Sequence, residues 1–354
     1  MITRFDHSQP HLISTKGVKM NHEAMHPETL VMKFILAKWI SKPIHVVATL
    51  KIPDILAEGD KSIADLSEIT NTHKDSLYRI MRALSSVGIF TETENRTFAN
   101  TPLSECLTAD RLRSTALMFH SWWHDKMWDN LLHTVRTGAP SFEHIFGMPA
   151  FDWFEKNPGE AELFHDANNY KAASSHRVIA DEYDFGGANT VIDIGGGFGG
   201  LIIEILKANP AIHGIVADLP GVVSQVGETI KKHNLEDRMS AVECDFFEKV
   251  PAGKDIYLLS HVLHDWPDDR CATILGNCRQ AMNSESRLII AEMIVPPDNS
   301  FSISKLLDIE VLLMGAGKER SEEEFGYLID SAGLTLARVI NTKENISMIE
   351  CLRA

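Results

Sequence analysis

A glycine-rich turn directly after an apolar segment constrains the fold of this chain more than any other feature. The segment VIDIGGGFGGL covers residues 191–201 and holds five glycines in the six positions from Gly195 to Gly200. Glycines at a junction between a strand and a helix let the backbone approach a ligand without an intervening side chain. From Asn189 onward, strand, turn and helix patterns alternate, which predicts an α/β domain with a parallel sheet covered on both faces.

Seven segments of this half have the apolar composition of strands. They are TVIDIGG, HGIVADLP, SAVECDFF, DIYLLSHVLH, RLIIAEMIV, LTLARVIN and NISMIECLR. The last two are separated by a short turn around Lys343 and Glu344, which is too short for a parallel crossover and predicts an antiparallel hairpin. We therefore expect a Rossmann-like domain whose seven-stranded, mostly parallel sheet ends in a C-terminal hairpin.

The N-terminal half has a different pattern. Apolar residues recur at helical spacing from Thr29 to about Asn169. Within this half, residues 62–88 read as two helices joined by a short turn, and residues 89–101 read as a small hairpin with Asn95 at its tip. This order of elements predicts a winged helix-turn-helix.

A winged helix raises the hypothesis of a DNA-binding regulator. Its second helix, which begins near Asp75, offers only Lys74, Arg79 and Arg82 as cations, and the chain carries a formal net charge of -15. That charge opposes binding to nucleic acid and to anionic membranes. We therefore favour a structural module and expect neither nucleic acid nor membrane as a partner.

Length and composition indicate a folded protein of two domains, since the chain has 354 residues of which 44% are hydrophobic. The five cysteines show no CxxC pair or zinc-ligand spacing, so we expect reduced thiols and no metal. The polar N-terminus lacks the apolar core of a signal peptide, and lysines interrupt the apolar stretch 30–56. These features predict a cytoplasmic protein.

The glycine turn by itself leaves two nucleotide ligands open. Gly195, Gly197 and Gly200 satisfy GxGxxG, and Asp218 ends the next strand at about the distance of a ribose-binding carboxylate, as in dinucleotide dehydrogenases. However, Asp193 lies inside the strand two residues before the glycines, where its charge would repel a pyrophosphate and would suit a cationic ammonium. A P-loop is excluded because no Gly-Lys-Ser/Thr follows.

A histidine and two glutamates follow at the ends of the later strands. His264 follows the fourth strand, Glu292 ends the fifth, and Glu319 lies on the next loop. Ligands of open α/β sheets bind at the carboxyl ends of the strands. A carboxylate bonded to one imidazole nitrogen fixes the tautomer and raises the basicity of the other nitrogen. The pattern predicts a general base, and we interpret the adjacent Asp265 as a turn-capping residue.

The segments DIGGGFGG, ADLP, VLHDWPDD, AEMIVP and GKERSEEEF, in this order, carry a resemblance. From Thr29 to the C-terminus the chain resembles plant and bacterial small-molecule O-methyltransferases related to caffeate and acetylserotonin O-methyltransferases, which are class I enzymes dependent on S-adenosyl-L-methionine. The resemblance implies this cofactor, the product S-adenosyl-L-homocysteine, a role in secondary metabolism and a homodimer. Residues 1–25 carry several His, Ser, Lys and Pro and little periodicity, which predicts a flexible tail or an arm that clasps a partner. The domains that follow are a winged-helix dimerisation domain at 26–110, a helical linker and acceptor-pocket region at 111–185, and the cofactor-binding catalytic domain at 186–354.

The resemblance also implies roles for particular residues. His264 matches the base, and Glu292 and Glu319 match the acids that orient it. The cofactor contacts implied by the glycine turn, the strand ends and the family are Asp193, Gly195, Gly197, Asp218, Leu219, Asp245, Phe246, Ser260 and Trp266. Ser260 stands where plant relatives often have a lysine that reaches the cofactor carboxylate.

The acceptor is expected to be a small hydroxylated aromatic compound. The residues implied to line its pocket are Phe119, Trp122, Trp123, Phe154, Asn168 and Met314. Asn168 replaces a methionine of relatives, which suggests a more polar acceptor or an altered orientation of the acceptor. The alternative is a related protein that uses S-adenosylmethionine for hydroxylation, decarboxylation or pericyclic chemistry, and the retained base with both glutamates disfavours it.

Overall fold

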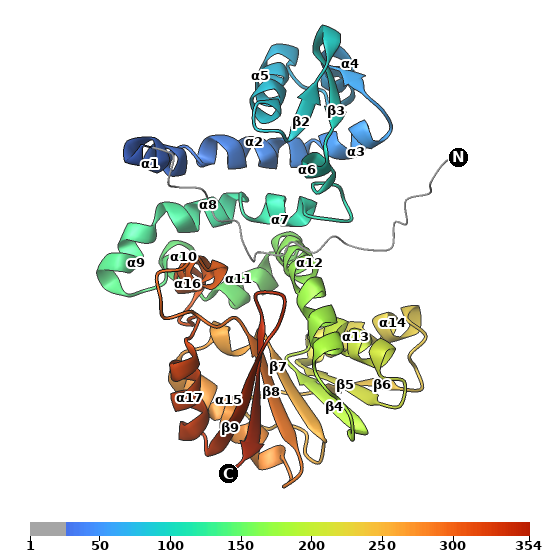
Figure 1. The fold of residues 1–354 in the computed structure, drawn as a ribbon, viewed down its shortest axis with the longest axis vertical. Coiled ribbons are helices and arrows are strands. Elements are labelled where there is room, and N and C mark those ends of the chain that lie inside the picture. Colours follow the sequence, from blue (N-terminus) through green and yellow to red (C-terminus); the bar gives the residue numbers. More distant parts are fainter. Residues whose placement is uncertain (1–25) are drawn as a thin grey trace. The chain divides into compact units, whose positions relative to one another are not determined.

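The computed structural model describes residues 26–354, apart from the Lys171 side chain (Figure 1). The tail predicted at 1–25 lies outside the described residues. The described chain forms two compact units. We call residues 131–150 and 172–354 the sheet unit, and residues 26–130 and 151–171 the wing unit.

The sheet unit is built on a seven-stranded sheet in the order β6-β5-β4-β7-β8-β10-β9 (Figure 1). Strands β4 to β8 are parallel, and β10 runs antiparallel to both β8 and β9. The predicted fold class, including the terminal hairpin, is therefore confirmed. The strands are β4 (Thr190–Ile194), β5 (His213–Asp218), β6 (Met239–Glu243), β7 (Ile256–Ser260), β8 (Arg287–Glu292), β9 (Leu334–Asn341) and β10 (Ser347–Arg353).

Both faces of the sheet are buried by helices. In β7, Tyr257 and Leu259 pack in one buried cluster with residues of α15 and α17, while Ile256 and Leu258 pack in a second cluster with residues of α13. A strand buried on both faces reads as a continuous apolar run, as this segment does. The helices of this unit are α9 (Leu131–Thr137), α10 (Ser141–Phe146), the second part of α12 (Pro158–Glu182), α13 (Gly200–Ala208), α14 (Pro220–Lys232), α15 (Asp268–Ala281), α16 (Ile303–Met314) and α17 (Glu322–Ser331).

The wing unit is mostly helical, as its apolar spacing predicted. A three-stranded antiparallel sheet in the order β1-β3-β2 completes it, with β1 (Lys61–Ser62), β2 (Phe90–Glu92) and β3 (Thr97–Asn100). Its helices are α1 (Pro27–Ile35), α2 (Lys38–Thr49), α3 (Ile52–Ala57), α4 (Ile63–Ile69), α5 (Lys74–Ser85), α6 (Pro102–Glu105), α7 (Arg113–Met118), α8 (Trp122–Asp129), most of α11 (Ala150–Lys156) and the first part of α12.

The winged helix-turn-helix has the predicted order of elements. Helix α4 begins with a capping box in which Ser62 and Asp65 satisfy each other's backbone N–H groups. The hairpin of β2 and β3 turns at Asn95, whose φ of 56° lies in the left-handed region that asparagine tolerates. Strand β1 was not predicted, because two residues carry no readable alternation. Within residues 26–354, no helix combines the length and apolar character needed to cross a bilayer.

Candidate functional site

The glycine turn after β4 forms a backbone-lined cradle. Gly195, Gly197 and Gly199 have φ angles of 71°, 54° and 84°, in the left-handed region that glycine adopts at no steric cost. A Cβ atom on Gly196 would lie 2.8 Å from Oδ2 of Asp193, whereas one on Gly197 would meet nothing within 4 Å. Open space above Gly197 is what close approach by a ligand requires.

Asp193 lies in β4 directly beneath this turn and is buried. Its Oδ1 atom accepts no hydrogen bond from the described part of the chain. Burial, together with the negative charge of Asp218, raises the pKa of Asp193 to about 7. A buried carboxyl without a partner is costly, and a cationic ammonium group would relieve that cost. These residues therefore fit the amino end of S-adenosylmethionine.

Asp218, the last residue of β5, is held in place by two backbone donors. Its Oδ2 accepts a hydrogen bond from Gly197 N at 2.8 Å, and its Oδ1 accepts one from Leu219 N at 2.7 Å. A carboxylate has about four acceptor positions, so two remain for ribose hydroxyls. The Leu219 side chain is exposed beside it, where it could contact a nucleoside.

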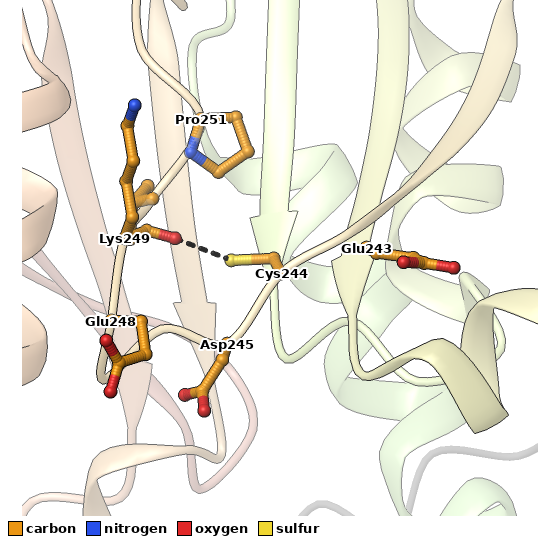
Figure 2. Close-up of a pocket in the computed structure, with 7 residues that line it drawn as sticks. Glu243, Cys244, Asp245, Glu248, Lys249 and Pro251 are labelled. Carbon is orange, nitrogen blue, oxygen red and sulfur yellow. Dashed lines mark hydrogen bonds between the residues drawn. The ribbon is translucent and has the colours of Figure 1, made fainter.

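Two of the predicted adenine contacts, Phe246 and Trp266, lie near the glycine turn. The Phe246 ring lies 3.5 Å from where a Cβ on Gly195 would stand, and it meets Trp266 edge-on with ring centres 6.2 Å apart. Asp245 accepts a hydrogen bond from Phe247 N at 2.9 Å. A depression of ≈ 300 Å³ adjoins Asp245 and is lined mainly by acidic and apolar residues, and Figure 2 shows the Asp245 carboxylate pointing away from the Cys244 thiol. Phe246 and Trp266 do not line this depression.

Ser260 ends β7, the strand next to β4 in the sheet. Its hydroxyl oxygen is buried and has no hydrogen-bond partner among the described residues. It therefore remains available as a donor for a ligand at this edge of the sheet.

His264 lies on a 3₁₀ turn, Leu263–Asp265, that follows β7. The fold brings it together with both predicted glutamates: its Nδ1 is 2.9 Å from Glu319 Oε1 and 3.5 Å from Glu292 Oε2. Glu292 Oε1 accepts hydrogen bonds from Val262 N at 3.0 Å and Leu263 N at 2.8 Å, so the same carboxylate fixes the turn that carries the imidazole.

Asp265 is not a turn cap, contrary to our interpretation of the sequence. Its Oδ1 lies 3.5 Å from His264 Nε2, and within the described residues its side chain makes no hydrogen bond that caps the turn. The 3₁₀ geometry turns the carboxylate toward the ring beside it. A third acid therefore faces the imidazole.

The three acids set the charge of the imidazole. Burial by itself opposes the charged ring, but the negative fields of Glu292, Asp265 and Glu319 outweigh it and raise the pKa of His264 to about 10. Burial also raises the pKa of Glu292, to about 7. His264 is thus a strong proton acceptor whose Nδ1–H is directed at Glu319. His261, His264 and Glu292 also have potential metal ligands within 4.8 Å of one another.

Arg320 is a functional neighbour that our reading of the sequence missed. The side chain is fully buried and donates to the carbonyls of Leu263 and Trp266, both at 2.8 Å, and to Asp268 Oδ1 at 2.8 Å. It therefore holds the backbone in place on both sides of His264 through hydrogen bonds. The only signal in the sequence was its place next to Glu319 in the GKER segment.

The residues expected at the acceptor divide between the units: Met314 ends α16 in the sheet unit, and the other five belong to the wing unit. In the wing unit, Trp123 and Phe154 are buried with ring centres 5.3 Å apart. Trp122 and Trp123 both donate to Glu160, at 2.8 and 3.1 Å. Phe119 meets His124 edge-on at 5.3 Å, and Asn168 is half-buried on α12.

Family models match most of the chain. A model described as an O-methyltransferase domain matches residues 128–335, and one described as an O-methyltransferase dimerisation domain matches residues 32–110. The chain belongs to the O-methyltransferase family. This assigns the glycine turn to a methyltransferase rather than to a dinucleotide dehydrogenase, and the winged helix to a dimerisation domain.

Several relatives of this methyltransferase come from bacterial secondary metabolism. It is 36% identical to the phenazine O-methyltransferase PhzM of Lysobacter antibioticus over 326 residues, covering 91% of this chain and 95% of the relative. It is 34% identical to the mitomycin biosynthesis 6-O-methyltransferase of Streptomyces lavendulae, covering 88% and 90%.

Solved structures agree with the family. The crystal structure of LaPhzM has a TM-score of 0.88 and 34% identity, covering 93% of this chain and 100% of that one. The O-methyltransferase NcsB1 from neocarzinostatin biosynthesis, solved with S-adenosylmethionine and 2-hydroxy-5-methyl naphthoic acid, has a TM-score of 0.77 and 29% identity, covering 89% and 96%. The resemblance read from the sequence is therefore confirmed, and with it S-adenosylmethionine as the cofactor of the family.

The hydrogen bonds from Arg320 to the turn around His264 should contribute measurably to the free energy of unfolding. Replacing Arg320 with Met removes the charged donor of the Leu263 and Trp266 carbonyls, which keep only longer hydrogen bonds from the Cys271 thiol and, for Leu263, from Trp266 N. We expect the free energy of unfolding to fall by about 3 kcal/mol in urea titrations. The matched control is Lys207→Met, which removes an exposed ion pair with Glu204 and should cost less than about 1 kcal/mol. Equal losses in the two variants would contradict the role given to Arg320.

Proposed function

We propose that this chain transfers the methyl group of S-adenosylmethionine to a hydroxyl of a small phenolic metabolite, with His264 as the general base. The observation that carries the proposal is the 2.9 Å contact between His264 Nδ1 and Glu319 Oε1. A proton held on Nδ1 leaves the lone pair of a neutral imidazole on Nε2. That lone pair is the group that can take the hydroxyl proton of an acceptor.

The remaining predicted residues divide the cofactor between them in this proposal. Asp193 holds the ammonium group, Asp218 the ribose hydroxyls and Ser260 the carboxylate. Gly195 and Gly197 carry no side chain and so let the backbone approach the cofactor. Leu219, Asp245, Phe246 and Trp266 surround the adenine. When bound, S-adenosylmethionine supplies an electrophilic methyl group on a positively charged sulfur, and the acids along this edge of the sheet suit that charge.

A hydroxyl acceptor explains why the site holds a base. A phenol becomes a strong nucleophile when it loses its proton, whereas a neutral ring nitrogen already presents a lone pair. Among the relatives is the phenazine-1-carboxylate N-methyltransferase of Pseudomonas aeruginosa, at 27% identity. Membership of the family therefore does not choose between oxygen and nitrogen as the methylated atom, and oxygen is part of our proposal. The buried cluster of His264, Glu292 and Glu319 supports oxygen as the atom that receives the methyl group.

We base the proposed acceptor class and oligomeric state on the relatives of this chain. We infer a hydroxylated aromatic acceptor of secondary metabolism, since NcsB1 was solved with a hydroxynaphthoic acid. We also infer that the dimerisation domain pairs two copies into a homodimer. We also propose that the protein acts in the cytoplasm.

Removal of the base tests the proposal directly. His264→Ala should lower kcat for labelled-methyl transfer to a panel of phenols by about 10²- to 10⁴-fold. Calorimetry with S-adenosylhomocysteine should show nearly unchanged affinity, because the imidazole serves the acceptor. His213→Ala, a change at an exposed histidine, is the control. Undiminished transfer by the His264 variant would refute the assignment.

The pH profile tests how the acids act on His264. The base works when deprotonated, so kcat/KM of the wild type should rise with pH toward the raised pKa of His264 near 10. Glu292→Gln removes a negative charge that favours the imidazolium, so the pKa falls and this limb should move to lower pH. Glu248→Gln, at an exposed carboxylate, should leave the limb in place. An unshifted limb in the Glu292 variant would show that this acid does not tune the base.

Asp193 can be tested by binding alone. Asp193→Asn keeps the shape but removes the charge that faces the ammonium group, and we expect affinity for S-adenosylhomocysteine to fall at least about tenfold by calorimetry. Stability should not fall, because the change removes a buried carboxyl that has an unpartnered oxygen. Unaltered affinity would move the ammonium group to another site.

A further inference from the structure

The cluster around His264 also contains the ligands of a transition-metal site. His261 follows β7 with a φ of 54°, and its ring centre lies 5.7 Å from that of His264. Ligand atoms of His261, His264 and Glu292 all lie within 4.8 Å of one another. Two imidazoles and one carboxylate are a ligand set that zinc prefers.

Glu292 has one oxygen committed and one available. Oε1 accepts two backbone N–H groups, but Oε2 is fully buried and accepts no hydrogen bond within the described residues. Oε2 lies 3.5 Å from His264 Nδ1. Two ligands at zinc bond lengths of about 2.0–2.2 Å in a tetrahedral site stand roughly 3.4 Å apart, so this pair needs little movement.

Glu319 adds a fourth possible ligand. Its Oε1 lies 2.9 Å from the same Nδ1 atom, and its Oε2 is buried without a hydrogen-bond partner among residues 26–354. The cations that flank Glu319 in sequence do not neutralise the cluster: Lys318 pairs with Asp268 and Glu324, and Arg320 pairs with Asp268. A buried group of acids around two imidazoles favours a divalent cation electrostatically.

We propose that a zinc-like divalent ion binds His264 Nδ1, Glu292 Oε2 and a ring nitrogen of His261, with Glu319 as a further ligand, and that it inhibits the enzyme. The ion takes the place of the proton on Nδ1. A neutral imidazole that binds metal through Nδ1 keeps its proton on Nε2, so the lone pair that would accept the substrate proton is lost. The binding stands on the geometry, and the inhibition rests on the proposed function of His264.

The test uses zinc chloride and the purified full chain after chelator treatment. His261→Asn removes one ligand while keeping a residue that tolerates the left-handed backbone. Calorimetry should show zinc binding that weakens at least about tenfold in this variant and also in Glu292→Gln. His213→Asn should bind as the wild type does and so accounts for zinc held by surface histidines.

Turnover supplies the second readout. Zinc should inhibit methyl transfer by the wild type, and EDTA should restore it. His261→Asn should keep its basal turnover and need at least about tenfold more zinc for the same inhibition. Zinc affinity in the His261 and Glu292 variants equal to that of the wild type would overturn the site, and zinc bound there without loss of turnover would overturn its inhibitory role. If no acceptor is methylated at all, the proposed function fails while calorimetry still decides whether the site exists.

Discussion

The buried carboxylate of Glu292 is the constraint on which the catalytic edge of this fold depends. It is fully shielded from solvent, so its oxygens depend on groups inside the fold. One oxygen accepts the N–H groups of Val262 and Leu263, and the other faces the imidazole of His264. Because β7 and β8 are adjacent parallel strands, the end of one can fix the turn that follows the other. A single side chain therefore sets both the backbone and the charge of the base.

The order of the strands places two acidic sites side by side along the carboxyl-end edge of the sheet. Strands β5, β4, β7 and β8 are neighbours in that order, and each ends at or just beyond a residue of the proposed site. Asp193 and Asp218 face the glycine turn, while Glu292 and Glu319 face His264. Burial of Asp193 beside the charge of Asp218 makes the first pair receptive to a cation, and the buried second pair stabilises an imidazolium. The same electrostatic principle serves binding at one end and proton transfer at the other.

Much of the fold and part of the site could be predicted because both follow from local patterns. Apolar periodicity gave the seven strands and the winged helix, and parallel strands place their carboxyl ends together, which brought His264 and Glu292 into one hypothesis. Arg320 and Asp265 were beyond such reasoning. Arg320 is buried only because its guanidinium finds the carbonyls of Leu263 and Trp266. Asp265 turns to His264 only because the 3₁₀ turn directs it there.

The sequence by itself determined the elements, their order, the glycines that need positive φ and the family resemblance, because these depend on neighbouring residues and on spacing along the chain. The tertiary structure alone decided which side chains meet and what charge they carry. His264 and Glu319 are 55 positions apart, yet their atoms lie 2.9 Å from each other. The pKa of a group depends on burial and on nearby charges, and both are properties of the folded chain rather than of its order of residues.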